Sequence, residues 1–236
     1  MDLIKVVVNA QQRQKYVDRL LQIDNLSHVK EDPHAAYCPI SLTQTPDEIK
    51  PYVKERQDIL ISYVLKKAGL TGYDPYTAPY SPDTNLRTLP NEIYQVDSAK
   101  VVGARYFVGH NLTASTGFGV ELEKATKFNR VAVILYDKKI RISRMQPHRI
   151  LYLEYDNFKK QRDEFVSVFT LLQAYEPGMG FHNGVPVLLG FKGKEVVDLE
   201  ELIYRTFPRL TYHYNGEMPI LKMRAENPEL FSEYSL

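Results

Sequence analysis

The chain has no tryptophan and only one cysteine, Cys38, in 236 residues. A single cysteine excludes an intramolecular disulfide and a zinc site built from several cysteines, and it favours a reducing, cytoplasmic setting. Charge of one sign is also lacking, because 30 basic residues face 29 acidic ones. No overall field would attract a nucleic acid polymer or an acidic membrane. No apolar run is long enough to cross a bilayer, and the start lacks the apolar core of a signal peptide.

Several catalytic motifs are absent as well. The chain has no phosphate-binding P-loop, no HExxH zinc motif and no GxSxG nucleophile turn. None of the six histidines is spaced from another as metal ligands usually are. We therefore expect neither a metal nor a cofactor.

The hydrophobic pattern alternates buried strands with helices. Strands are predicted at 35–40, 71–76, 105–110, 131–136 and 149–155. A helix follows four of them, at 45–68, 91–102, 119–127 and 157–175. This order predicts an α/β fold, a doubly wound (flavodoxin/Rossmann-like) five-stranded parallel sheet.

Two flanking segments do not fit that alternation. Residues 1–33 are interpreted as an N-terminal arm, in which 6–23 is either one helix or a short strand followed by a helix. Residues 34–175 form the α/β domain. Residues 176–236, with a strand predicted at 185–191 and a helix at 198–207, are interpreted as a C-terminal appendage packed on the core.

The stretch from Ser115 to Ala125 joins two buried strands through a turn with two glycines and a helix start. Ligands of open α/β sheets bind at such turns. Gly117 and Gly119 would let a ligand approach the backbone, and Glu121 would lie in the first helical turn beside it. Alternatively, the glycines only make the turn and Glu121 only complements the helix dipole.

Two more polar residues lie near the same edge of the predicted sheet. His110 ends the third strand and either contacts a ligand or has a structural role. Asp97 lies in the preceding helix, where an isolated aspartate is usually solvated. Cys38, beside the first strand, is interpreted as a small buried hydrophobic residue, because nothing pairs it with a histidine.

Together these residues resemble a known family. Ile93-Tyr94-x-x-Asp97, followed by Ser115-x-Gly117-x-Gly119-x-Glu121-Leu122, is similar to the signature of the nucleoside 2-deoxyribosyltransferase-like superfamily. The match is best to its 2'-deoxynucleoside 5'-phosphate N-hydrolase branch. The resemblance spans about residues 35 to 155 and leaves both flanking segments outside.

The resemblance implies a chemistry for the two acids. Glu121 matches the family's nucleophile, whose carboxylate approaches C1' of a sugar as the bond to the base breaks. Asp97 matches the acid that orients the nucleophile or protonates the leaving base. The implied substrate is a small nucleoside or nucleotide. A site shared between subunits would imply a homodimer or a higher homo-oligomer.

Other residues would hold the substrate. Ser115 stands where deoxyribosyltransferases usually carry aspartate, and a hydroxyl there favours a nucleoside 5'-monophosphate; its alternative role is to cap the helix. Ser143, aligned only with a one-residue gap, resembles a serine that reaches the phosphate from the neighbouring subunit. Tyr37, Tyr73 and Tyr76 are candidates for the base pocket.

The chain also departs from the family pattern. The first strand continues into Cys38-Pro39-Ile40-Ser41, with no glycine and with a proline that lacks an amide donor. Arg105 replaces an aspartate that usually begins the third strand. These departures leave open a non-catalytic nucleotide-binding or sensor module of the same fold. A third possibility is an interaction subunit whose aromatic C-terminal segment binds a partner.

Overall fold

The computed structural model describes residues 4–8, 10–41, 45–78, 89–110, 112, 115–139, 149–182, 185–214 and 218–219. Its central element is a five-stranded sheet in which each neighbouring pair of strands is parallel. The strands are β2 (Asp32–Tyr37), β3 (Thr71–Tyr73), β4 (Ala104–His110), β5 (Val131–Asp137) and β6 (Ile150–Tyr155). Their order is β3-β2-β4-β5-β6, which confirms the predicted doubly wound fold.

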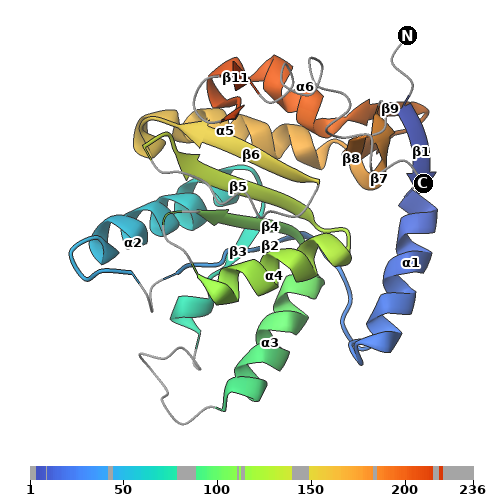
Figure 1. Ribbon diagram of the computed structural model, residues 1–236, viewed down its shortest axis with the longest axis horizontal. Coiled ribbons are helices and arrows are strands. Elements are labelled where there is room, and N and C mark those ends of the chain that lie inside the picture. The colour runs from blue at the N-terminus through green and yellow to red at the C-terminus, as the bar shows by residue number, and fades with distance from the viewer. Residues whose placement is uncertain are drawn as a thin grey trace.

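This strand order reverses between β2 and β4 (Figure 1). The chain winds from β2 outward to β3, then returns to the other side of β2 and continues through β4, β5 and β6. Crossovers on opposite faces part at such a reversal, so the carboxyl ends of β2 and β4 border the crevice where this fold binds ligands.

Helices cover both faces of the sheet. On one face pack α2 (Lys50–Ile59), its π-helical continuation (Leu60–Leu65) and α5 (Phe158–Gln173). On the other face pack α3 (Pro90–Gly103) and α4 (Thr116–Lys127). All seven residues of β5 are buried, as expected for a strand with a helical layer on each side.

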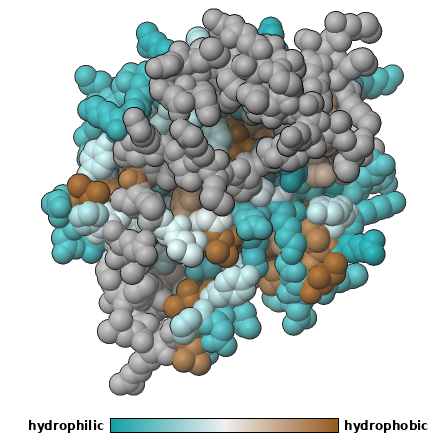
Figure 2. All heavy atoms as spheres, viewed as in Figure 1, coloured by the Kyte–Doolittle hydropathy of each residue, from teal (hydrophilic) through white to brown (hydrophobic). Residues whose placement is uncertain are grey.

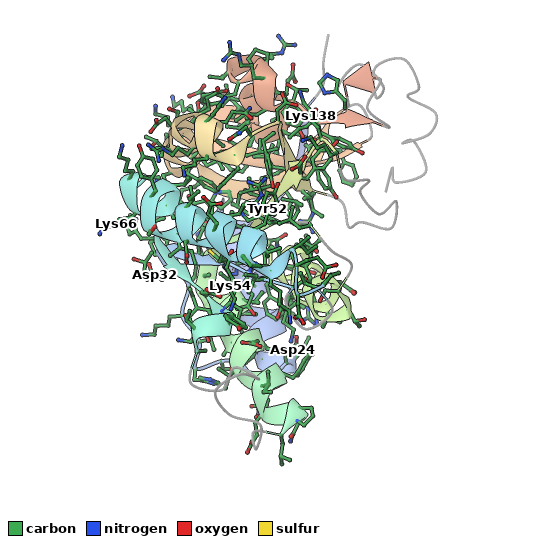
Figure 3. The ribbon with its side chains drawn as sticks, turned by 90° about the vertical axis from the view of Figure 1, so that its left-hand side faces the viewer. Asp24, Asp32, Tyr52, Lys54, Lys66 and Lys138 are labelled. Atoms are coloured by element: carbon green, nitrogen blue, oxygen red, sulfur yellow. The ribbon has the colours of Figure 1, made fainter. Side chains whose placement is uncertain are left out.

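The helix predicted from residue 45 begins later, at Lys50. Pro51 lies in its first turn, where the missing amide hydrogen costs no helical bond. The helical stretch ends near Gly69, whose φ of 79° lies in the left-handed region. Figure 3 views the molecule with α2 in front of the sheet and labels Tyr52 and Lys54 near its start.

The two flanking segments share a second, antiparallel sheet. Its strands are β1 (Ile4–Val8), β7 (Glu176–His182), β8 (Val185–Lys192) and β9 (Glu195–Asp198), in the order β1-β7-β8-β9. The arm is therefore a strand followed by α1 (Ala10–Ile23). The alternative of one continuous helix over 6–23 is wrong.

The pattern of β7 did not predict a strand, because glycine has low strand propensity. Gly178 leaves room there for the ring of Phe191 on the paired strand, because a Cβ at this position would lie 2.2 Å from Cε2 of that ring. The strand and helix predicted further on are confirmed as β8 and α6 (Leu199–Thr206).

Helix α6 packs on the large core. Leu199, Ile203 and Tyr204 belong to the same buried cluster as the strands β5 and β6. The Tyr204 hydroxyl donates a hydrogen bond to the carbonyl oxygen of Tyr152, at 2.8 Å. On the face shown in Figure 2, the visible hydrophobic side chains form small groups among polar ones. No helix in the described ranges has both the length and the apolar character needed to span a membrane.

Candidate functional site

Helix α4 begins at the reversal point of the sheet, directly after β4. Ser115 is its N-cap, with an extended backbone and a side-chain oxygen that accepts a hydrogen bond from the Phe118 amide at 3.3 Å. The helix-capping role considered for Ser115 is therefore present. A hydroxyl that accepts this bond still has its own hydrogen to donate to a ligand.

The packing of Phe118 against Gly109 sets the position of α4 on the sheet. The Phe118 ring lies edge-on to Phe107, with ring centres 5.6 Å apart. A Cβ at Gly109 would lie 2.5 Å from Cε2 of Phe118, so only glycine lets the ring pack this closely. Leu122 and Ala125 continue the buried face of the helix. The packing of this face fixes the rotation of α4 about its own axis. It therefore also fixes the direction in which the Glu121 side chain leaves the helix.

Glu121 lies half-buried beside the end of β2. Its Oε1 atom accepts a hydrogen bond of 2.9 Å from the hydroxyl of Tyr37. Burial raises the pKa of Glu121 to about 7, the Tyr37 hydrogen bond opposes that rise, and the nearby charge of Asp97 adds to it. This carboxyl group therefore changes protonation near neutral pH.

Asp97 comes to this place from α3. Its Oδ1 atom is buried without a hydrogen-bond partner among the described residues, and burial raises its pKa to about 6. The charge of Asp97 also acts on Tyr37, whose own pKa is raised mainly by burial. The structure thus brings together Asp97 and Glu121, which lie 24 positions apart in the sequence, around one tyrosine hydroxyl.

Tyr73 extends this cluster. Its ring stacks on that of Tyr37, with ring centres 5.7 Å apart and planes at 26°. The ammonium group of Lys100 lies 5.1 Å from the centre of the Tyr73 ring. Tyr37 is fully buried and Tyr73 is half-buried, so Tyr73 is the ring that a ligand could reach.

Gly117 and Gly119 lie exposed in the first turns of α4. Neither has a positive φ, so the backbone conformation does not demand glycine at either position. A Cβ at Gly119 would have no atom within 4 Å. The two glycines therefore leave open space beside the helix start, close to Glu121 in the sequence.

His110 and Tyr76 lie apart from the two acids. Tyr106, Val108 and His110 alternate onto the α2/α5 face of the sheet, whereas Phe107 and Gly109 face α4. The His110 ring is buried edge-on against Phe158, with ring centres 4.7 Å apart, and burial lowers its pKa to about 3.

Tyr76 is on the same side as His110. It packs with residues of α2, and its hydroxyl lies 3.0 Å from Nζ of Lys54. The sheet thus separates Tyr37 and Tyr73, two candidates for the base pocket, from Tyr76, the third candidate. His110, the candidate ligand contact, lies on the side of Tyr76.

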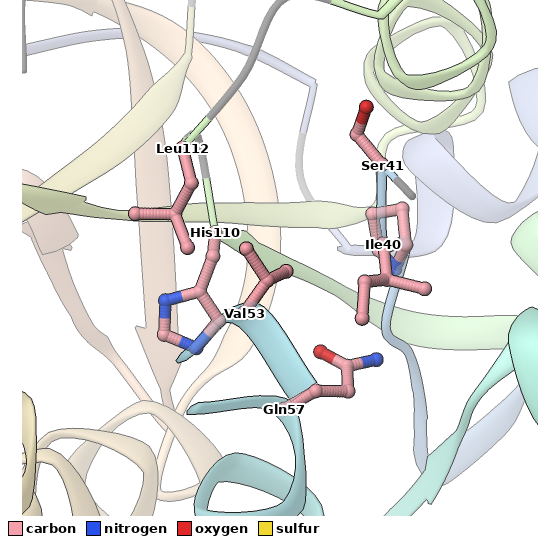
Figure 4. A pocket seen from close by; sticks show the side chains of 7 residues that line it. Ile40, Ser41, Val53, Gln57, His110 and Leu112 are labelled. Atoms are coloured by element: carbon pink, nitrogen blue, oxygen red, sulfur yellow. The ribbon is translucent and has the colours of Figure 1, made fainter. Parts of the chain in front are cut away.

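A shallow recess lies on that side (Figure 4); it measures about 220 Å³ with the solvent at its mouth and has almost no room for a water-sized sphere. Gln57, which the sequence gave no reason to select, lines it together with His110. Its amide nitrogen donates to the Cys38 carbonyl oxygen at 2.8 Å, while its oxygen is buried without a partner in the described part of the chain. The other lining residues are Pro39, Ile40, Ser41, Val53 and Leu112.

Three further predictions concern single residues. Ser143 lies outside the described residues. Cys38 is fully buried, as predicted. Arg105 is the second residue of β4, at the opposite edge of the sheet, where its Nε lies 2.8 Å from Glu31; this departure from the family pattern is therefore not at the acid cluster. In the described ranges, no three His, Cys, Asp or Glu side chains group as a metal site would.

Comparison with known proteins adds a similarity in structure. No protein-family model matches the chain, and no curated protein matches its sequence. Among solved structures, the chain is similar to the CMP N-glycosidase BcmB of Clostridium botulinum, with a TM-score of 0.40 and 14% sequence identity. The alignment covers 55% of this chain and 95% of that one. A similarity at this level decides no activity for this chain.

Proposed function

We propose that this protein cleaves the N-glycosidic bond of a nucleoside or nucleoside 5'-monophosphate, or exchanges its base, with Glu121 as the nucleophile. The observation that carries the proposal is the joint burial of Glu121 and Asp97 around the Tyr37 hydroxyl, at the ligand-binding edge of the sheet. Two carboxyl groups with pKa values near neutrality can divide the roles of nucleophile and acid.

In the first step, the ionised Glu121 carboxylate attacks C1' of the sugar. A glycosyl ester forms as the C1'–N bond breaks, and the electron pair of that bond leaves with the base. Asp97 gives its proton to the departing nitrogen. In the second step, water or another base attacks C1', loses a proton to Asp97 and restores the Glu121 carboxylate.

The proton distribution limits this mechanism in the free protein. With a pKa of about 7 for Glu121 and about 6 for Asp97, a pair that shares one proton holds it mainly on Glu121. The reactive arrangement has it on Asp97. A substrate that offers an acceptor nitrogen to Asp97 and a positive C1' to Glu121 favours transfer of the shared proton from Glu121 to Asp97.

The test uses a panel of nucleosides and nucleoside 5'-monophosphates in the ribose and deoxyribose series. Release of free base from each compound is measured by chromatography. Glu121→Gln keeps the shape of the side chain and removes the nucleophile, so base release should fall to the level without enzyme. Glu123→Gln, on an exposed position of the same helix, is the matched control and should keep wild-type turnover. Equal turnover of the two variants would remove Glu121 from its role.

A nucleotide-binding module without catalysis is the second candidate. It is favoured by Pro39, which offers no amide hydrogen to a phosphate, and by the use of the Ser115 oxygen as a helix cap. This candidate predicts that nucleotides raise the melting temperature of the wild type while no base is released on long incubation. Base release by the wild type excludes it.

A further inference from the structure

An arginine-rich cluster lies at the amino ends of the parallel strands, at the opposite edge from the two acids. Glu31, just before β2, is its centre. Its carboxylate contacts Nη2 of Arg13 at 3.3 Å, Nε of Arg105 at 2.8 Å, and Nη1 of Arg130. Arg105 also lies 3.2 Å from Glu176, the first residue of β7. The cluster therefore joins the two sheets.

Arg149 adds a fourth guanidinium group, which pairs with no carboxylate of the described residues. Its partners are neutral: the Thr126 carbonyl oxygen at 3.0 Å, the Met179 sulfur at 2.8 Å and the side-chain oxygen of Asn129. Within the described part of the chain, four guanidinium groups thus meet two carboxylates, of which Glu176 is more than half exposed. Positive charge is in excess in a place with little water to screen it.

Three buried donors in this cluster, on Arg13, Arg130 and Asn129, also lack acceptors among the described residues. Arg130 and Asn129 are 3% and 5% exposed. Nε of Arg130 and Nδ2 of Asn129 have no hydrogen-bond partner among the described residues. Because Oδ1 of Asn129 accepts from Arg149, the orientation of the amide is settled and its nitrogen remains a donor. Buried N–H groups in proteins are rarely left without an acceptor.

Both residues line one recess together with Arg149, Thr126, Gly178 and Leu188. The recess measures about 210 Å³ with the solvent at its mouth, and a water-sized sphere finds room there about once. Asn129 and Arg149 both have left-handed backbones, with φ of 56° and 64°. For arginine this conformation is unfavourable, and such residues are concentrated at ligand sites.

We propose that this recess is a binding site for one compact monovalent anion of the size of chloride. A water molecule would satisfy the N–H donors but would leave the excess positive charge in place. An anion accepts hydrogen bonds from the N–H donors and also neutralises the excess positive charge. The repulsion is visible in Arg130, where burial and then the neighbouring Arg13 lower the pKa to about 9. The site is independent of the proposed glycosidase activity.

The test is thermal unfolding of the full chain in sodium chloride and in sodium gluconate at equal ionic strength. Gluconate is too large for the recess. Chloride should raise the melting temperature by about 3–6 °C at a tenfold excess over its dissociation constant, and above that concentration the melting temperature should keep rising with the logarithm of the chloride concentration. Coincident curves in the two salts would overturn the proposal, as would a response to phosphate without one to chloride.

The substitution Asn129→Asp places a carboxylate in the recess. It should raise the melting temperature in gluconate above that of the wild type and abolish the response to chloride. Asn25→Asp is the matched control, because Asn25 is exposed and has nearly the same backbone, with φ of 57°; it should keep the wild-type response. An Asn129→Asp variant that still responds to chloride as the wild type does would also overturn the assignment.

Discussion

Removing the hydroxyl of Tyr37 should change the rate of the proposed reaction in a way that depends on pH. The hydroxyl donates to the Glu121 carboxylate at 2.9 Å and therefore stabilises its ionised form. Tyr37→Phe keeps the ring and its stack on Tyr73 but deletes the donor. The pKa of Glu121 should then rise above its value of about 7, so that less of the nucleophile is ionised at neutral pH.

The magnitude follows from the hydrogen bond. A bond to a charged acceptor contributes roughly 1.5–3 kcal/mol, and a shift of one pKa unit corresponds to about 1.4 kcal/mol, so we expect a rise of at least about one unit. The ionised fraction of Glu121 then falls about fivefold at pH 7 and about ninefold at pH 6, by the same relation. At pH 9 both proteins are almost fully ionised and the rates should agree closely.

The assay is kcat/KM for base release between pH 5.5 and 9, expressed as the ratio of variant to wild type. The ratio removes any dependence on Asp97 that both proteins share. Tyr155→Phe is the matched control, because the Tyr155 hydroxyl is buried on the other face without a partner in the described part of the chain. Its ratio should stay near one throughout.

A Tyr37→Phe ratio that is low but constant with pH would refute this reasoning. The hydroxyl would then act on the substrate or the transition state, and not on the ionisation of Glu121. A ratio of one at every pH would show that the hydrogen bond has no effect on the reaction.

Three further outcomes follow from the same site. Asp97→Asn should lower the pKa of Glu121 by removing a like charge and slow base release by about 10²- to 10⁴-fold, with loss of the alkaline limb of the pH–rate profile, the expected scale for a general acid. Folding raises the pKa of Glu121 from 4.5 to about 7, so wild-type stability should fall as pH rises through that window. Urea unfolding at pH 8 should accordingly find Glu121→Gln more stable by about 3 kcal/mol, with no difference at pH 4. Gly109→Ala should cost about 1–3 kcal/mol by overpacking, whereas Gly119→Ala should gain about 0.5–1 kcal/mol of stability and raise KM, because its methyl group enters the space beside the helix start.

The stability prediction has a general physical reason. A carboxyl group held away from water near its ionisation point costs folding free energy at the pH where it works. The fold tolerates this cost next to a sheet whose strands are buried on both faces. Favourable free energy of folding from other parts of the molecule, for example the packed β5 strand, offsets the cost of such a site.

The sequence alone indicated the sheet and the candidate acids. Continuous apolar runs such as 131–136 form strands wherever two helical layers cover them, and the alternation of strands and helices sets the parallel connection. The motif around Glu121 was visible because a turn, a cap and a helix start are local features. Their residue types follow from backbone geometry over a few positions.

Tertiary structure decided which distant groups meet. The glycines of β7 kept its sequence from being recognised as a strand. Their role, which is to leave space for the Phe191 ring, appears only when β8 is paired beside β7. The excess of arginine over carboxylate at the amino edge was likewise invisible, because a total charge of +1 says nothing about local charge.

The side of the sheet on which each residue lies was also decided in three dimensions. For His110 the sequence allows either a ligand contact at this edge or a structural role. The two-residue alternation of β4 turns its ring to the face opposite Glu121, against Phe158. Tyr37 turned out to donate a hydrogen bond to Glu121, across 84 residues of sequence. Local pattern determines what a segment becomes, whereas burial, pKa and hydrogen bonding depend on neighbours that only the packed fold supplies.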